Sequence, residues 1–369
     1  QQNKMVSIFI KKRRFFNHVK RFLSNPANII LIVFLVILVF MIFYPLFTLI
    51  LSTFQVSSIT ETLFGVKYGD LTGLWWYRMF ASDMSSTYFW MPLLNSILMS
   101  LLASVIAILY GGVVAFFITR TNMKGKKFIS AIFVFPYIMP SWTLATFWQN
   151  FWQNPSIGTG TGGMLYNITG LSVPASWVYG LVPCAIVLGL HYAPFAYILI
   201  GGILRNMDAN LEEAATILKA SRAKIIYRIT LPIVLPALVS TFLLVFASSM
   251  SSYAVPKYIG GDMTVLTTYM KNFLNNGYYG QGYIMALVMI VLGVAILAAN
   301  QYITGKRKSF TTVSGKSGQV SYINLHKANY VVATILTILS LFCAVLPLIT
   351  FALESCCVIP GDYSTLTLE

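Results

Sequence analysis

Seven long apolar stretches alternate with polar segments along this chain of 369 residues. They lie at about 29–51, 91–119, 128–149, 180–204, 233–252, 283–304 and 330–353. Each is about 20 residues or longer, the length that an α-helix needs to cross the hydrocarbon layer of a membrane. The third stretch contains Pro136 and Pro140, so we expect its helix to be kinked or broken there. The pattern predicts an all-α fold, a polytopic transmembrane helical bundle in a lipid bilayer.

The basic residues of the polar segments predict how this bundle is oriented. Of the 25 Lys and Arg residues, 7 precede the first stretch, 4 lie at 120–127, 5 at 205–228 and 5 at 306–327. These four segments fall on one side of a seven-span topology, and Lys and Arg near span ends favour the cytoplasmic side. We therefore expect residues 1–28 to form a basic, cytoplasmic N-terminal segment.

Composition narrows the functional classes. Hydrophobic residues make up 57% of the chain, charged residues make up 9%, and mean hydropathy is +0.75. The net charge of +15 is compatible with a nucleic-acid ligand, but membrane topology explains why the charges cluster between spans, so no nucleic acid is expected. The first stretch lacks a small-residue cleavage site, which favours an uncleaved span over a signal peptide.

Covalent chemistry and metal binding are not indicated by the sequence. The cysteines show no CxxC spacing and no nearby histidines, so neither a metal site nor a disulfide framework is predicted for Cys184, Cys343, Cys356 and Cys357. The sequence also shows no paired carboxylates and no nucleophile–base pattern. We therefore do not expect an enzyme.

Residues 206–232, between the fourth and fifth stretches, are unusually charged for this chain. Apolar residues recur there at helical spacing, at Leu211, Ala214, Ala215, Leu218 and Ile225. Asp208 or Asn210 would cap the start of this helix. Pro232 and Pro236 interrupt the pattern where the chain re-enters an apolar stretch. A polar helix between two spans suits docking onto a soluble partner; the alternative is a solvated amphipathic linker.

Four motifs occur in and after this segment: Glu213-Ala214-Ala215, Ala220-Ser221, Ile229-Thr230-Leu231-Pro232 and Pro236-Ala237-Leu238. They resemble the EAA loop of type I ABC importer permeases, the inner-membrane components of binding-protein-dependent transport systems. The resemblance extends over about residues 90–305 and includes Asn95-Ser96 and Arg120-Thr121. The tract HYAPF at 191–195 is similar to permeases for ferric iron, thiamine, phosphonate and polyamines.

This resemblance implies a permease subunit of an ATP-driven importer in the bacterial plasma (inner) membrane. The loop would form a coupling helix that sits in a groove of a cytoplasmic ABC ATPase dimer. That partner would bind ATP and Mg, so this chain would hold no cofactor. The contact residues implied are Glu213, Ala214, Ala215, Lys219, Ala220, Ser221 and Pro232.

Lys219 departs from the family pattern, which usually has glycine at this position. Glycine would end the helix and begin a turn there. Lys219 therefore predicts either a continuous helix or a turn with a different backbone geometry.

The resemblance also implies a transport mechanism. ATP binding and hydrolysis in the partner would move the docked helix and tilt spans three to six between inward-open and outward-open arrangements. An extracellular or periplasmic solute-binding protein would deliver substrate to the outer loops at 150–178 and 253–282. Ferric iron is the expected substrate, ahead of phosphonate, thiamine and polyamines.

We interpret residues 29–305 as the permease transmembrane domain and 306–329 as a cytoplasmic linker. Residues 330–369 resemble the first span of a second, incomplete permease half, because Leu346-Pro347-Leu348 is similar to Tyr44-Pro45-Leu46. Two six-span halves are often fused in the iron and thiamine group, so the chain resembles the first half of such a double permease. A second permease half, on the same or another chain, would be needed for transport.

Four polar residues are candidates for lining a translocation pathway: His191, Gln149, Asn150 and Tyr253. His191 lies inside a span, where an ionisable residue is a functional hypothesis. The alternative is a neutral histidine bonded to a neighbouring helix. The other three lie near outer ends of spans, where anchoring at the membrane interface is an equally good explanation.

Two glycine-containing motifs have simpler explanations than ligand binding. SGKSG at 314–318 resembles a phosphate loop, but Phe310 occupies the position of its first glycine, so a flexible connector is expected. GTGTGG at 158–163 lacks the lysine of such loops, so a loop or turn is expected.

Two other functions are alternatives. A secondary transporter driven by an ion gradient would need carboxylates within its spans, and the only candidate is Glu354, at the very end of the seventh, so the sequence argues against this function. A non-transporting membrane scaffold or sensor would use the charged loop to recruit a soluble protein. Loss of both substrate uptake and ATPase docking on mutation of the loop would exclude the scaffold.

Overall fold

The computed structural model describes residues 22, 24–157, 162–207, 209–305, 322–358, 365 and 367. Helices form their regular structure, which confirms the all-α fold. They are α2 (Pro26–Ser52), α3 (Leu74–Phe80), α4 (Met91–Arg120), α5 (Lys126–Ile138), α6 (Ser141–Trp152), α7 (Met164–Thr169), α8 (Ala175–Val178), α9 (Leu181–Arg205), α10 (Ala209–Ile217), α11 (Arg222–Ile225), α12 (Leu231–Met250), α13 (Ala254–Ile259), α14 (Leu266–Asn275), α15 (Tyr279–Gly305) and α16 (Ala328–Ser355).

Six helices among the described residues are long and apolar enough to cross a membrane, and the bent pair α5–α6 makes a possible total of seven spans. Every long stretch expected from the sequence is one of these, and the observed boundaries lie within four residues of the expected ones. The repeated apolar stretches therefore predicted the six candidate spans and the bent pair α5–α6.

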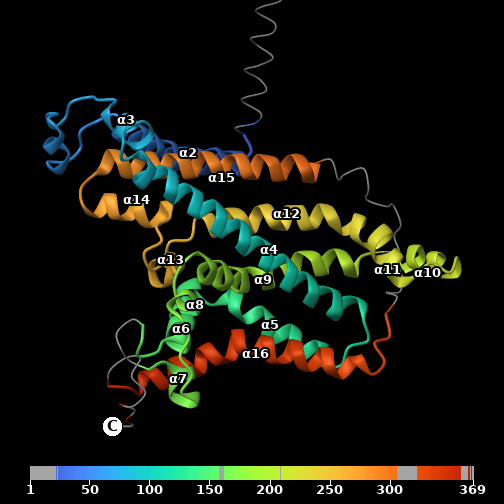
Figure 1. Cartoon of the computed structure of the whole chain (residues 1–369). Helices are drawn as coiled ribbons and strands as arrows, with labels where there is room; N and C mark the ends of the chain where they lie inside the picture. The colour runs from blue at the N-terminus through green and yellow to red at the C-terminus, as the bar shows by residue number, and fades with distance from the viewer. Residues whose placement is uncertain are drawn as a thin grey trace, which may run out of the picture.

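The long helices lie side by side, and the shorter helices gather at the two ends of the bundle (Figure 1). We call one end the α10 end, which comprises residues 120–127, 205–207, 209–230 and 322–328. We call the opposite end the α3 end, which comprises residues 53–90, 139–157, 162–181 and 251–280. Consecutive spans alternate in direction between these two ends (Figure 1).

The third span is broken, as its prolines predict. α5 and α6 meet at an angle of 99° across Met139 and Pro140. Met139 has an extended backbone (φ −70°, ψ 144°), the conformation that a following proline favours. Since Pro140 has no N–H, the helical hydrogen bonds cannot continue through this point. As a result α5 runs along the bundle, whereas α6 runs across it at the α3 end (Figure 1).

α4 and α9 pack closely because small residues line both helices. Gly111 of α4 lies so near α9 that an added Cβ would be 2.2 Å from the carbonyl oxygen of Ala193. Gly189 of α9 meets the side chain of Ile106 in the same way. Other small residues buried on the two helices are Ala103, Ala107, Ala115, Ala185 and Ala196. Close backbone approach through small residues is a usual way for helices to associate in membranes.

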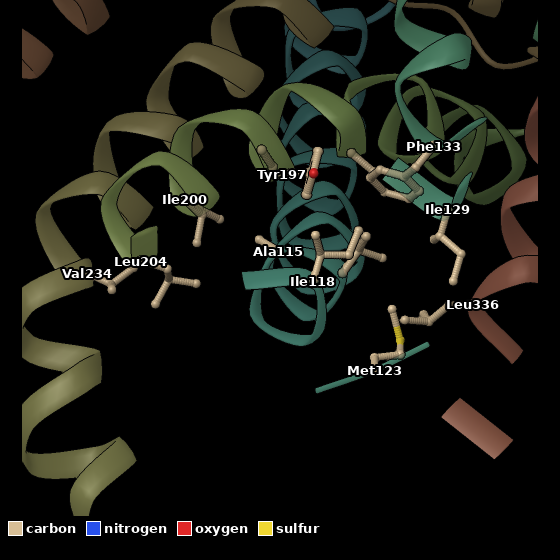
Figure 2. Close-up of a cluster of buried hydrophobic side chains, with 13 residues drawn as sticks. Ala115, Ile118, Met123, Ile129, Phe133, Tyr197, Ile200, Leu204, Val234 and Leu336 are labelled. Atoms are coloured by element: carbon tan, nitrogen blue, oxygen red, sulfur yellow. The ribbon is translucent and has the colours of Figure 1, made fainter. Parts of the chain in front are cut away.

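A hydrophobic core joins α4, α5, α9, α12 and α16 in the half of the bundle nearest the α10 end (Figure 2). Its labelled members are Ala115, Ile118, Met123, Ile129, Phe133, Tyr197, Ile200, Leu204, Val234 and Leu336. Leu336 brings α16 into this core, so the last described span packs against the same group of helices as the others.

The expected interruption at Pro232 and Pro236 was wrong. Residues Arg222–Met250 form one helical segment that is long enough to span a membrane. A π-helical turn at Ile226–Thr230 leads into α12, and Pro232 lies in the first turn of α12. The segment continues through Pro232 although this residue has no N–H to donate, and the irregular π turn lies directly before it.

The α3 end forms a folded lobe around a buried carboxylate. Glu61 is fully buried, and its Oε2 accepts hydrogen bonds from the N–H groups of Ser57 (2.7 Å) and Ser58 (3.2 Å). Its Oε1 accepts one from the N–H of Gly280 at 2.6 Å. Trp75, which is also fully buried, packs in the lobe's core. The lobe is thereby fixed to the start of α15.

Candidate functional site

α10 extends beyond the ends of α9 and α12, away from the bundle (Figure 1). Ala214 is exposed, and the exposed fractions of Leu211 and Leu218 are 49% and 82%. Leu211, Ala214 and Leu218 are spaced i, i+3 and i+7, so they share one side of the helix. We call these three residues the α10 patch. An uncovered apolar surface on a polar, exposed element is typical of a site for a partner protein.

α10 ends in a turn that glycine usually forms. Lys219 has a φ of +56°, in the left-handed region. Its N–H donates to the carbonyl of Thr216 (2.9 Å), and the N–H of Ala220 donates to that of Ala215 (3.0 Å). This pair of hydrogen bonds is the Schellman motif. Both expectations for Lys219 were therefore wrong: the helix is not continuous, and the lysine adopts the left-handed backbone that glycine favours.

The other residues implied to contact an ATPase lie in the same part of the molecule. Glu213, Ser221 and Pro232 are exposed, whereas Ala215 and Ala220 are half-buried. The Ser221 hydroxyl also accepts a hydrogen bond from the N–H of Lys224 at 3.4 Å, so it caps α11. Exposure makes these residues available to a partner.

Glu212, not its neighbour Glu213, faces the bundle. Glu212 forms an ion pair with Arg120, the last residue of α4, and Arg120 is 1% exposed. The second carboxylate oxygen of Glu212 accepts a hydrogen bond from the hydroxyl of Thr230 at 2.9 Å. The Nη1 of Arg120 also donates to the carbonyl oxygen of Leu204 in α9, at 3.5 Å. This ion-paired group joins α10 to three spans.

The sequence analysis placed Arg120 in a family motif and did not predict its contact with Glu212. A signal was present, because Arg120 is a charged residue at the end of an apolar helix in a chain with few charges. Charged side chains in such positions are usually paired.

Basic residues are concentrated at the α10 end. Those described there are Arg120, Lys124, Lys126, Lys127, Arg205, Lys219, Arg222, Lys224, Arg228 and Lys327. Those described at the α3 end are Lys67, Arg78, Lys257 and Lys271. The arrangement in space therefore has the charge asymmetry expected from the sequence, with most basic residues at one end of the bundle.

His191 has a structural partner. It is 7% exposed, and its Nδ1 donates to the carbonyl oxygen of Pro136 in α5 at 2.9 Å. The helical donor to that carbonyl would be the N–H of residue 140, which is proline. His191 thus satisfies a carbonyl that the break between α5 and α6 leaves without its helical donor. This arrangement agrees with a histidine bonded to a neighbouring helix.

The other pathway candidates are held by separate partners at the α3 end. Gln149 donates to the hydroxyl of Tyr179 at 3.0 Å, and Asn150 donates to the carboxylate of Glu354 at the end of α16. Tyr253 is 39% exposed and immediately precedes α13. Gln149, Asn150 and His191 thus have separate partners among the described residues.

α16 is fixed to the permease domain at the α10 end. Residues around Ile323 form a parallel bridge with Thr121. The Asn329 side chain donates to the carbonyl of Asn122 (2.9 Å) and accepts from the N–H of Lys124 (2.8 Å). Together with Leu336 in the core, these contacts make α16 an integral part of the bundle.

Several expected features lie outside the described residues. These are the cap at Asp208, most of the N-terminal basic segment, residues 158–161 of the glycine-rich loop and the motif at 314–318.

The comparison with known families decides the class of protein. Residues 107–309 match the model of the family described as "Binding-protein-dependent transport system inner membrane component". The chain belongs to this family. It is therefore a multi-pass inner-membrane permease of transport systems rather than an enzyme. The match includes α10 and its contacts to Arg120 and Thr230.

Two relatives illustrate the range of substrates within the family. The permease is 26% identical over 240 residues to the putative ferric transport system permease protein FbpB 1 of Haemophilus influenzae, covering 63% of this chain and 37% of that protein. It is 24% identical over 251 residues to the spermidine/putrescine transport system permease protein PotC of the same organism, covering 68% and 88%. The match thus spans about a third of the ferric relative's length.

Solved structures support the fold. The permease resembles a chain in the crystal structure of a bacterial alginate ABC transporter in complex with an alginate pentasaccharide-bound periplasmic protein, with a TM-score of 0.59. The two are 16% identical, and the match covers 81% of this chain and 100% of the other. This likeness establishes the arrangement of helices.

Proposed function

We propose that this permease is the membrane-spanning subunit of an ATP-driven importer and that α10 docks in a groove of a cytoplasmic ABC ATPase dimer. The contact residues would be those of the α10 patch together with Glu213, Ala214, Ala215, Lys219, Ala220, Ser221 and Pro232. The observation that carries the proposal is the α10 patch, which is apolar, uncovered and located at the more basic end of the bundle. Small side chains such as Ala214 let a helix approach a partner closely.

The α10 end would face the cytoplasm, with the N-terminus on the same side. Its concentration of Lys and Arg supports this orientation. A solute-binding protein would then approach the α3 end, where the segments at 150–178 and 253–282 lie. Neither partner is needed to fold α10, since its turn and its ion pair are internal to the chain.

We further propose that α16 is the first span of a second permease half. The family match ends at residue 309, before α16, and the match to the ferric relative covers 37% of that relative. Transport would require the second half to complete the pathway. Ferric iron is the substrate we propose, because a relative is described as a ferric permease and the tract HYAPF is similar to permeases of the group that includes ferric iron. Phosphonate, thiamine and polyamine are the alternatives.

Site-directed crosslinking tests the docking proposal. In a chain without its four native cysteines, Ser221→Cys would be co-expressed with the candidate ATPase carrying a surface cysteine in its groove. We expect a crosslink whose yield changes when ATP is added. The matched control is Ile59→Cys, because Ile59 is 82% exposed but lies at the α3 end.

A chain in which Ser221→Cys reacts with a small thiol reagent but does not crosslink would contradict the proposal. A membrane scaffold that recruits another soluble protein would then explain the α10 patch better. Crosslinking of Ile59→Cys to the ATPase would instead contradict the orientation.

A further inference from the structure

Glu212 attaches α10 to the bundle almost alone. Among the α10 residues whose side chains are described, 211–217, it is the one that is buried. Leu211, Glu213 and Ile217 are exposed, so apolar packing does little to hold this helix. A short helix without apolar packing depends on its polar contacts for a fixed position.

The two carboxylate oxygens of Glu212 bind different parts of the bundle. Oε2 pairs with Arg120 at the end of α4, and Oε1 accepts from the hydroxyl of Thr230, immediately before α12. Hydrogen bonds to a charged group are shorter and stronger than those between neutral groups. Movement of α10 relative to either span would therefore break a buried, charge-assisted contact.

Arg120 extends this connection to α9. Its guanidinium presents donors in one rigid plane, so one side chain binds the carboxylate of Glu212 and the carbonyl of Leu204 at once. Leu204 lies in the last turn of α9. Because α4 and α9 are packed through Gly111 and Ala193, displacement of one helix displaces the other.

We propose that Arg120, Glu212 and Thr230 are positioning residues that transmit movement of α10 to α4, α9 and α12. This rests on the proposed function, because a docked ATPase must move α10 first. The residues of the α10 patch would bind the partner, whereas these three would pass its movement on. Docking and transmission are thus assigned to different residues.

The experiment follows docking and transmission separately in the complex of the full chain with its ATPase, reconstituted in lipid nanodiscs. A crosslink from Ser221→Cys reports docking. A fluorophore on Ser251→Cys, an exposed position directly after α12 at the α3 end, reports movement of α12 when ATP is added. ATP is the probe, so no transported substrate is required.

Thr230→Val removes the hydroxyl at nearly constant size, and Thr230→Ser, its matched control, retains it. In Thr230→Val and in Glu212→Gln we expect the Ser221 crosslink to persist. The fluorescence response at Ser251 should fall by about fivefold, the order of change that residues in a coupling network produce. Thr230→Ser should restore the response. Glu213→Gln should instead weaken the crosslink and the response together.

An undiminished Ser251 response in folded Thr230→Val would overturn the proposal. So would loss of the crosslink in Thr230→Val and Glu212→Gln, because these residues would then shape the docking surface itself. If Glu212→Gln does not fold, the comparison of Thr230→Val with Thr230→Ser tests the proposal. Absence of the Ser221 crosslink in the chain that carries no further substitution would overturn the proposed function as well. This failure is distinct from failure of the further proposal, which would be seen only in the Thr230 and Glu212 variants.

Discussion

The two ends of the bundle are built in different ways. At the α3 end, the carboxylate of Glu61 receives three backbone N–H groups, and aromatic and aliphatic side chains such as Trp75 are completely buried around it. At the α10 end, a carboxylate is again buried, at Glu212, but the apolar side chains beside it are exposed. The α3 end has a core of its own, whereas α10 itself is anchored by polar contacts and not by a core.

The difference shows what a docking element requires. A helix that must bind a partner cannot use its apolar residues for internal packing, so its position must depend on a few polar contacts. Arg120, Glu212 and Thr230 supply these contacts, and Leu218 remains available to a partner. The α3 lobe keeps its shape through its own burial of apolar surface.

Replacing a leucine at each end should give the largest contrast in stability. Leu266→Ala at the α3 end removes a fully buried side chain and should lower the free energy of unfolding by about 3 kcal/mol. Leu218→Ala should change it by less than about 0.5 kcal/mol, because that side chain is 82% exposed. Chemical unfolding in detergent micelles measures both. Equal losses would show that Leu218 is packed after all.

Breaking the ion pair between Arg120 and Glu212 should have the next largest effect on the free energy of unfolding. Arg120→Met leaves Glu212 buried without its cation, and we expect the free energy of unfolding to fall by about 3 kcal/mol. This is the low end of the usual range, because α10 can move outward and expose the carboxylate to water. The double variant Arg120→Met, Glu212→Leu should recover most of it, since it leaves no unpaired charge. If the double variant were as unstable as the single one in the same unfolding assay, the pair would not be coupled.

The buried carboxylate of the α3 lobe should tolerate no isosteric amide. Glu61→Gln replaces one acceptor oxygen by an N–H₂ group that faces backbone donors, so we expect a loss of about 2 kcal/mol. Asp70→Asn is the control, because Asp70 lies in the same segment with an exposed side chain. Thermal unfolding followed by circular dichroism would measure both, and equal midpoints would contradict the role of Glu61.

A substitution in the turn after α10 should have the smallest effect on stability, and it should stabilise the protein where the others destabilise it. Lys219→Gly places glycine in a left-handed backbone, and it should stabilise the turn by about 1 kcal/mol. Lys219→Ala, which also removes the charge but keeps the Cβ, is the matched control. Amide hydrogen exchange of residues 211–218 would measure the change. Faster exchange in the glycine variant than in the alanine variant would contradict this account.

Much of the fold could be predicted from the sequence because apolar stretches and prolines act locally. The spans were found within a few residues, and the break at Pro140 follows from the missing N–H of a single residue. The candidate helix at 209–217 was also predicted, because its charges stand out in an apolar chain. These features need no knowledge of neighbouring helices.

The contacts that fix the candidate site could not be predicted in the same way. Whether Glu212 or Glu213 faces Arg120 depends on the rotation of α10 about its axis, which adjacent residues do not reveal. The left-handed turn at Lys219 is imposed by the hydrogen bonds of the Schellman motif against the preference of the lysine itself. The hydrogen bond from His191 to the carbonyl of Pro136 depends on how α9 packs against α5, two helices that are far apart along the chain.

Hydrogen exchange with and without the candidate ATPase tests whether α10 is the docking element. We expect amides of residues 211–218 to exchange more slowly in the complex than in the isolated permease, because the α10 patch becomes covered. Amides of the α3 lobe, residues 53–90, should exchange at the same rate in both. Protection confined to the α3 lobe, or no change at residues 211–218 in a stoichiometric complex, would contradict the claim that the α10 end is the docking surface.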